Sequence, residues 1–351
     1  PVEGCDGSAD GRPEALTFRR YESFARGGAG LIWLEATAVL HRGRANPRQL
    51  WLRRETVEDF ARMVETIYRC AADEFGSEHR PVTVAQLTHS GRYSKPDGAP
   101  APIIAYRHPV LDARHSLPSD YPIITDAELD ALQDLYVEAA RCARDAGFDA
   151  VDVKACHGYL LYELLNAFTR EDSRYGGDYE GRTRMVREIV ARVREEVPEI
   201  AIVSRLSVYD AMPHPYGFGM AEDGSMEPDL TEPVRLINEL QEMGVCLINV
   251  AYGSPYYNPH VERPYDTHEI GGYVPEEHPL TDIATMVQLH RELAAQTEMP
   301  LMATGYTWLR EFAPGVGAAL VEAGEAVNIG WGRQALAHPD FPREIVEQGA
   351  L

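Results

Sequence analysis

The chain has 351 residues, 44% of them hydrophobic and 25% charged, and its formal net charge is −22. This composition allows a sizeable core and argues against a disordered chain. Because nucleic acid binding needs a basic surface, the acidic balance argues against nucleic acid as a partner and against docking on an anionic membrane. No apolar run is long enough to span a bilayer, so we expect no membrane association.

The cysteines are widely separated in the sequence and odd in number: Cys5, Cys70, Cys142, Cys156 and Cys246. They form no Cys-x-x-Cys pair and no Cys/His cluster, which are the patterns typical of disulfide frameworks, zinc sites and iron–sulfur sites. We therefore expect no bound metal and a reducing, cytoplasmic location.

In chain order, a helix is predicted at residues 16–25, a buried strand at 30–39, a helix at 56–73 and a strand at 81–87. The Pro-rich segment 93–122 is too long for an ordinary connection, so we expect a functional loop over a site. Thr125, with Glu128 three residues further on, has the pattern of a capping box and begins a helix that runs to residue 146.

The stretch from 148 to 182 carries a dense group of reactive side chains. Apolar and polar residues alternate from 151 to 156, which predicts a strand with two different faces. Lys154, His157 and Tyr159 thus lie within six residues at the carboxyl end of this strand, the end where α/β barrels carry their chemistry. A short apolar helix and a loop with Tyr175-Gly176-Gly177 follow.

The remaining elements are a helix at 179–197, a strand at 200–206, a helix at 233–243, a strand at 245–251, a helix at 280–296, a strand at 300–304, a helix at 316–323, a strand at 326–330 and a helix at 342–348. This alternation is typical of a parallel sheet with crossover helices. Seven strands without a dinucleotide-type glycine fingerprint favour a (β/α)8 TIM barrel over a doubly wound sheet. We expect one domain at residues 1–351, with most of the first strand preceding Pro1.

Several strand ends carry residues suited to ligand binding. Gly305, Gly332 and Arg333 follow the last two strands, where barrels bind phosphate. Gln86 and Arg205 interrupt apolar strands, and a buried arginine needs an ion-pair partner or a ligand. For Arg205 the partner is either an internal carboxylate or an electron-accepting ring that the guanidinium stabilises as negative charge develops on it.

Lys154, His157 and Tyr159, at the end of the strand predicted at 151–156, each fit more than one function. An inward-facing lysine needs a partner or a ligand, so Lys154 fits an oxyanion-binding cation or the Schiff-base nucleophile of a barrel lyase. His157 and Tyr159, taken alone, fit structural roles as well as catalytic ones.

Five motifs in order along the chain resemble the old yellow enzyme family of FMN-dependent oxidoreductases, which includes ene-reductases and 2,4-dienoyl-CoA reductase-like enzymes. These are E-A-T-A-V (35–39), Q-L-T-H-S-G-R (86–92), C-H-G-Y-L (156–160), R-Y-G-G-D-Y-E-G-R (174–182) and I-G-W-G-R (329–333). The resemblance implies a flavin-binding barrel. It assigns contacts with FMN to Pro1 and Ala36 at the ring, Gln86 at its pyrimidine edge, Arg205 near N1 and O2, and Gly305, Gly332 and Arg333 at the phosphate.

The resemblance also implies the reaction. NADH or NADPH would reduce the flavin, which would pass hydride to an α,β-unsaturated small molecule while Tyr159 protonates the neighbouring carbon. His157 and Lys154 would bind the substrate oxygen, although Lys154 stands where most relatives have histidine, and Glu3 stands where they have Thr or Cys. These departures leave oxidative chemistry on an amine or C–H substrate open.

The resemblance leaves two questions of assembly. The first is whether the chain forms a homo-oligomer, which the sequence leaves open. An iron–sulfur cluster and a second nucleotide-binding domain, present in larger relatives, are expected only if the parent chain extends past Leu351.

Overall fold

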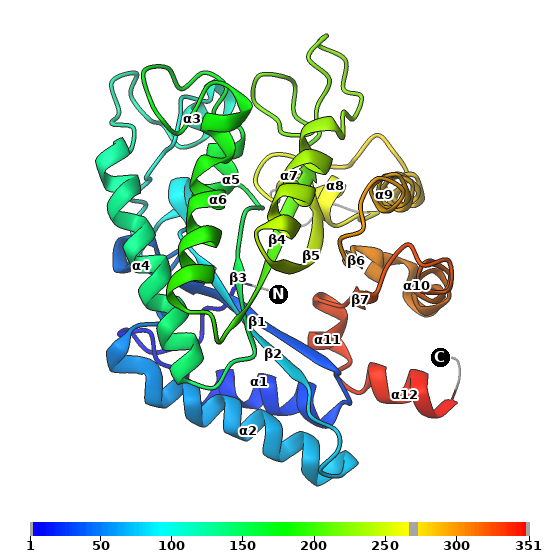
Figure 1. Cartoon of the computed structure of the whole chain (residues 1–351). Helices are drawn as coiled ribbons and strands as arrows, with labels where there is room; N and C mark the ends of the chain where they lie inside the picture. Colours follow the sequence, from blue (N-terminus) through cyan, green and yellow to red (C-terminus); the bar gives the residue numbers. More distant parts are fainter. Residues whose placement is uncertain (1–2, 267–272, 349–351) are drawn as a thin grey trace.

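A computed structural model of the chain describes residues 3–266 and 273–348. Its seven parallel strands form one sheet in sequential order, and each pairs with the next (Figure 1). The strands are β1 (Leu31–Ala38), β2 (Val82–Thr88), β3 (Ala150–Val153), β4 (Ala201–Tyr209), β5 (Val245–Tyr252), β6 (Leu301–Thr304) and β7 (Asn328–Gly330). The sheet curls into an open barrel, which confirms the predicted TIM-barrel class with an incomplete strand set.

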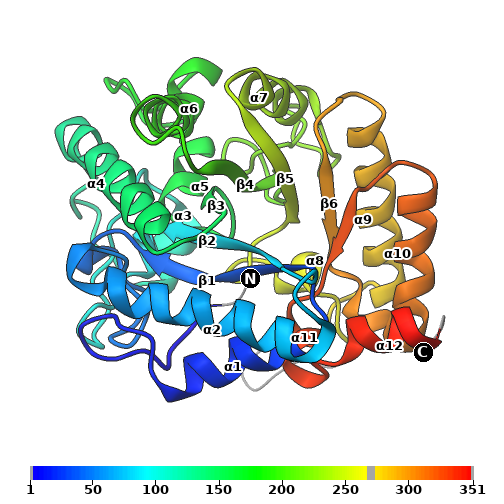
Figure 2. The same ribbon diagram turned by 60° about the horizontal axis from the view of Figure 1, so that its bottom comes forward.

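The longer helices lie on the outer face of the curled sheet (Figure 2). They are α1 (Ala15–Arg26), α2 (Val57–Phe75), α4 (Asp126–Asp145), α6 (Tyr179–Glu196), α7 (Thr231–Glu242), α9 (Pro279–Ala294) and α10 (Ala313–Glu322). All four residues of β3 are buried, because the helices cover one face of the strand and the barrel interior covers the other. Each of these helices was expected from the sequence to within three residues at either end.

Shorter helices occupy the connections. They are α3 (Pro109–Arg114), α5 (Leu160–Leu165), α8 (Pro259–Glu262), α11 (Arg333–Ala337), α12 (Phe341–Gln348) and the 3-10 helices η1 (His41–Gly43), η2 (Arg54–Thr56), η3 (Gly91–Tyr93) and η4 (Tyr306–Phe312). The predicted loop 93–122 therefore contains a helix, which begins where Pro109 occupies its first turn and His108 caps it. Within the described residues, no helix combines the length and apolar character needed to cross a membrane.

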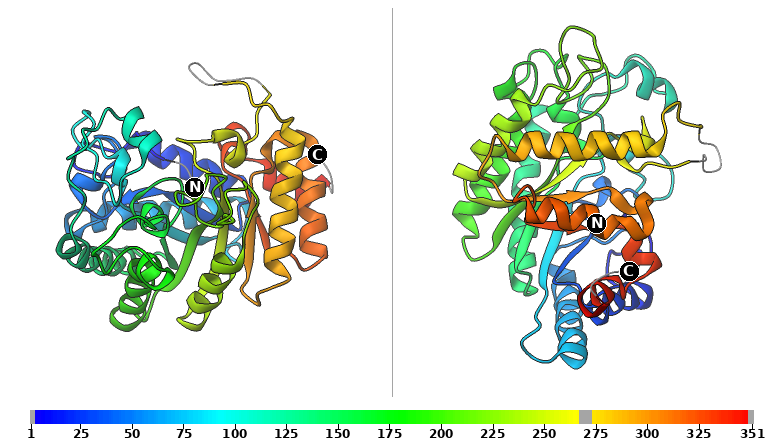
Figure 3. Two further views of the ribbon diagram at one scale, coloured as in Figure 1. Left: turned by 90° about the horizontal axis from the view of Figure 1, so that it is seen from above. Right: turned by 90° about the vertical axis from the view of Figure 1, so that its right-hand side faces the viewer.

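The sheet is open between β1 and β7, since in the described part of the chain β1 pairs with β2 and β7 with β6. The C-terminal helices, red in Figure 3, lie near this opening, and the start of α12 lies close to the C-terminal end of α1. The backbone N–H of Arg343 donates to the carbonyl of Gly27 at 3.0 Å. Trp331 packs against Phe341 with 5.0 Å between ring centroids. These contacts hold the last helices across the open edge.

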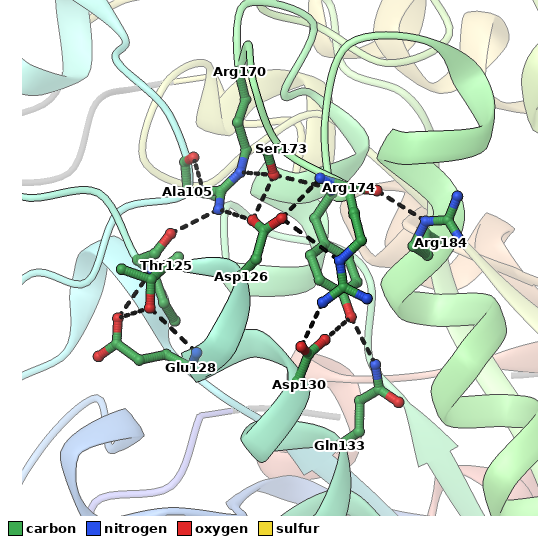
Figure 4. A network of polar contacts seen from close by, with 12 residues as sticks. Ala105, Thr125, Asp126, Glu128, Asp130, Gln133, Arg170, Ser173, Arg174 and Arg184 are labelled. Carbon is green, nitrogen blue, oxygen red and sulfur yellow. Dashed lines mark hydrogen bonds and ion pairs between the residues drawn. The ribbon is translucent and has the colours of Figure 1, made fainter.

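The segment after α5 is fixed to the start of α4 by a dense polar network (Figure 4). The guanidinium of Arg170 donates to the carbonyls of Ala105 and Ile124, both at 2.7 Å, and to Asp126 at 2.9 Å. The hydroxyl of Ser173 donates to the same carboxylate at 2.6 Å. The R-Y-G-G-D motif that follows therefore begins on a firmly held loop.

The Thr125 side chain accepts a hydrogen bond from the N–H of Glu128, which confirms the predicted capping box.

Candidate active site

A cavity of about 950 Å³ lies inside the curled sheet and extends into the opening between β1 and β7. This volume is within the range of sites that bind cofactors and small molecules. Eight of the residues predicted from the sequence line it: Gln86, Lys154, His157, Tyr159, Arg205, Gly305, Gly332 and Arg333. The structure thus gathers residues from five strand ends around one space.

Lys154, His157 and Tyr159 form a polar wall of the cavity, and Lys154 and Tyr159 lie at its centre. Nζ of Lys154 lies 3.7 Å from the centroid of the Tyr159 ring, and both side chains are buried. Burial lowers the pKa of Lys154 below its usual value of 10.5. Burial, reinforced by Tyr256 and Glu3, raises the pKa of Tyr159 well above 10. The phenol therefore keeps its proton at neutral pH.

The carboxylate of Glu3 lies beside this pair. The hydroxyl of Tyr159 donates a hydrogen bond to Glu3 Oε2, and the hydroxyl of Tyr256 donates to the same oxygen at 3.4 Å. Tyr256 also stacks on Tyr93 with 3.5 Å between ring centroids. Glu3 is exposed, so it connects a buried phenol to solvent. The role of Tyr256 was not predicted, because nothing in its Tyr- and Pro-rich loop marks one tyrosine over another.

His157 sits in a left-handed backbone conformation with φ +63°, directly before Gly158. Its Nε2 lies 3.1 Å from Oε1 of Glu262, a residue of α8 that the sequence analysis did not identify. Burial, together with the charges of Arg205 and Lys154, lowers the pKa of His157 well below 6.5. Burial also raises the pKa of Glu262. The imidazole is therefore neutral at pH 7.

Asp152 organises the neighbouring part of the barrel interior. Its carboxylate accepts hydrogen bonds from Gln86 Nε2 at 2.5 Å, from Trp33 Nε1 at 2.9 Å and from the backbone N–H of Arg205 at 2.7 Å. Burial raises the pKa of this carboxyl group, and the three donors act against that shift. The contacts fix the orientation of Gln86 at the cavity wall and the position of β4 at Arg205.

The glycines predicted at the phosphate site differ from one another. Gly305 has φ +106°, and a Cβ there would lie 2.7 Å from Sδ of Met286, so both backbone conformation and packing require glycine. A Cβ at Gly332 would meet nothing within 4 Å, which leaves open space beside Arg333 at the cavity edge.

One predicted cofactor residue, Ala36, does not line the cavity, and the placement of another, Pro1, is not described. Ala36 is buried in a small cluster with Ala45, Tyr93 and Tyr159, adjacent to the polar wall. Pro1 lies outside the described residues.

The donor set fits FMN. Guanidinium groups suit a phosphate and an electron-accepting ring, and open space at Gly332 suits an anion. Two buried carbonyl oxygens, Oδ1 of Asn249 and Oδ1 of Asn328, have no hydrogen-bond partner in the described part of the chain, although both residues line the cavity. Such orphaned acceptors suit the hydroxyl groups of a bound cofactor.

An open parallel barrel with cationic, amide and phenolic groups around one large cavity defines a class: α/β-barrel enzymes that bind a large cofactor. The profile of the NADH:flavin oxidoreductase / NADH oxidase family matches residues 4–351. The chain belongs to this family, which works with FMN and a nicotinamide nucleotide.

The chain is similar to an NADPH dehydrogenase of Geobacillus sp. (strain WCH70), with 31% identity over 71% of this chain and 66% of that protein. The matched stretch therefore spans slightly less than two thirds of that relative. The old yellow enzyme homologue of Zymomonas mobilis has a similar structure, with a TM-score of 0.70, 21% identity and coverage of 100% of this chain and 88% of that one. Histamine dehydrogenase from Rhizobium sp. 4-9 gives a TM-score of 0.71 at 21% identity, with coverage of 97% and 45%.

Proposed function

We propose that residues 1–351 form one FMN-binding domain that uses NADH or NADPH to reduce activated, α,β-unsaturated small molecules. The observation that carries this proposal is the convergence of Lys154, His157 and Tyr159 on one wall of the cavity. When bound, FMN supplies hydride transfer between the nicotinamide and the substrate carbon. The chain must then bind the cofactor, orient the substrate and provide a proton.

Cofactor binding falls to residues of the β2, β4, β6 and β7 ends. Gln86, held by Asp152, would bind the pyrimidine edge of the ring, and Arg205 would stabilise negative charge on it. Gly305, Gly332 and Arg333 would hold the phosphate. The family resemblance would place Pro1 and Ala36 against the ring, although Ala36 does not line the cavity.

Proton donation falls to Tyr159. Its raised pKa keeps the phenol protonated, and its hydrogen bond to Glu3 links the hydroxyl to a carboxylate that can replace the proton once the phenol has given it to the substrate. Glu3, exposed on its other side, returns a proton from solvent after each turnover. His157 and Lys154 bind the substrate oxygen, so that negative charge developing on it in the transition state is stabilised by a neutral N–H donor and a cation.

A second candidate is oxidation of an amine or C–H substrate by the same site. The carboxylates of Glu3 and Glu262 both line the cavity, and a substrate ammonium would be attracted to either. A barrel of this fold is called a histamine dehydrogenase, so the fold accommodates that chemistry. Family membership argues against the other alternative, a lyase that forms a Schiff base at Lys154.

The first test is a visible absorption spectrum of the purified protein, followed by heat release and identification of the chromophore. We expect FMN, together with NAD(P)H consumption that depends on an added enone. An FMN-loaded protein that does not reduce enones, but that reduces a dye when given an amine, would establish the oxidative alternative. Failure to bind FMN at all would overturn both.

We also propose a cytoplasmic location, because all five cysteines are free. Cys156, next to the catalytic residues, is buried, and burial raises the pKa of its thiol to about 12. It is therefore an unreactive core residue, and the proposed reaction does not use it.

A further inference from the structure

Three metal-ligating side chains meet outside the active site. His260 lies on α8, Glu277 lies two residues before α9, and Asp282 lies in the first turn of α9. One ligand atom from each lies within 4.8 Å of the other two. The three residues come from the carboxyl side of the barrel, where α8 contacts α9.

Asp282 points to a ligand at this place. The residue is only 8% exposed, and its buried Oδ2 has no hydrogen-bond partner among residues 3–266 and 273–348. The buried carboxylate of Asp152, in contrast, accepts three hydrogen bonds. A buried carboxylate without a donor is costly, and a second carboxylate beside it increases the cost unless a cation is bound.

We infer that His260, Glu277 and Asp282 bind a divalent transition-metal ion such as Zn²⁺. One imidazole nitrogen and two carboxylate oxygens suit an ion of intermediate softness, and water fills a fourth position. The hydroxyl of Tyr273 is hydrogen-bonded to Nδ1 of His260 and restrains its ring. Ligand atoms around a tetrahedral zinc lie about 3.3 Å apart. The three ligand atoms, which lie within 4.8 Å of one another, therefore draw closer when the ion binds, and the exposed side chain of Glu277 has room to move.

The site has a consequence for the active site, because α8 carries both His260 and Glu262. Glu262 lies 3.1 Å from His157 at the cavity wall. An ion that joins α8 to α9 therefore holds Glu262 in one position beside His157. This consequence rests on the proposed function, whereas the metal site itself does not.

The test is Zn²⁺ binding to the full FMN-loaded chain after chelator treatment, measured by calorimetry at neutral pH. We expect one ion per chain, with Mg²⁺ and Ca²⁺ binding at least 100-fold more weakly. Asp282→Asn should weaken Zn²⁺ binding at least 100-fold, and His260→Gln about as much. Glu276→Gln removes the same charge as Glu277→Gln from the adjacent exposed position, and it should leave affinity within twofold.

Thermal unfolding separates lost binding from lost folding. Without metal, Asp282→Asn should unfold at the same temperature as the unmodified chain or a higher one, because the variant lacks the buried charge. Added Zn²⁺ should raise the unfolding temperature of the unmodified chain and of Glu276→Gln only. Equal Zn²⁺ affinity in Asp282→Asn and Glu276→Gln, or no binding by the unmodified chain, overturns the site whatever the catalytic activity proves to be.

Discussion

Two neighbouring parts of the chain, 154–159 and 170–182, are similarly rich in charged and aromatic residues, but their polar groups are satisfied in different ways. In the second part, Arg170 meets two carbonyls and a carboxylate at 2.7–2.9 Å, and Arg182 donates to the carbonyl of Leu165 at 2.8 Å (Figure 4). In the first part, Lys154 and His157 face a cavity and have pKa values lowered by burial.

This difference shows how residues that stabilise the fold can be told apart from residues that bind a ligand, when both kinds occur in sequence motifs. A polar group that the protein fully satisfies stabilises the fold and has little capacity left for a ligand. A polar group whose charged form is destabilised gains most from a ligand or a transition state. We therefore expect changes in 154–159 to affect rates and changes in 170–182 to affect stability.

The largest effect is expected for Tyr159→Phe. A general acid contributes roughly 10²–10⁴-fold to rate, so the alkene-reducing half-reaction should slow by about that factor. Reduction of the flavin by NAD(P)H should stay within about twofold, because it needs no proton from the phenol. Stopped-flow measurement of each half-reaction checks this. Equal losses in both would show that Tyr159 acts on the cofactor instead.

Arg170→Ala should have the largest effect on stability in the comparison. Its removal leaves buried acceptors unsatisfied and should lower the free energy of unfolding by about 3–5 kcal/mol. Arg174→Ala is the matched control: its side chain is 56% exposed and pairs with the exposed Asp130, so the loss should stay under about 1 kcal/mol. Denaturant unfolding measures both. Unchanged stability in Arg170→Ala, with a fall in kcat, would reverse the assignment.

The fold and the centre of the site were predictable because local patterns encode them. Alternation of helix and strand gives the parallel barrel, and strand ends converge, so Gln86, Lys154 and Arg205 were placed at one cavity without knowledge of their contacts. The flavin residues followed from motifs. Their individual roles remain predictions, and Pro1 is outside the described chain.

The remaining features depend on contacts that no local pattern records. Tyr159 and Glu3 are 156 positions apart in sequence, and the partner of His157 lies on α8, a helix of four residues. Such a helix is too short to show a periodicity. The group formed by His260, Glu277 and Asp282 likewise has no recognised spacing, since it exists only where α8 meets α9.

Glu3→Gln should have an intermediate effect on turnover, and it tests how Tyr159, in the 154–159 part of the chain, regains its proton. Glutamine keeps an acceptor for the Tyr159 hydroxyl but cannot carry a proton from solvent. Steady-state turnover should therefore fall by about 10-fold, while a single turnover from reduced enzyme should remain nearly unchanged. Tyr256→Phe removes only the weaker donor to Glu3, at 3.4 Å, and serves as the control. A fall in the single-turnover rate would show that Glu3 acts on the chemical step itself.

The smallest effect is expected for Lys154→His, which tests whether the lysine selects substrates. Because burial lowers the pKa of Lys154, its cation is lost at a lower pH than the usual 10.5. The KM for an unsaturated carboxylate should therefore rise with pH as that proton leaves, while the KM for an uncharged enone should not change. The variant should lose this pH dependence and reduce simple enones a few-fold faster, about 1 kcal/mol or less in barrier. Equal pH profiles for both substrates would mean that Lys154 binds the reacting oxygen in every substrate, and that the site's selectivity lies with Glu3 and Glu262.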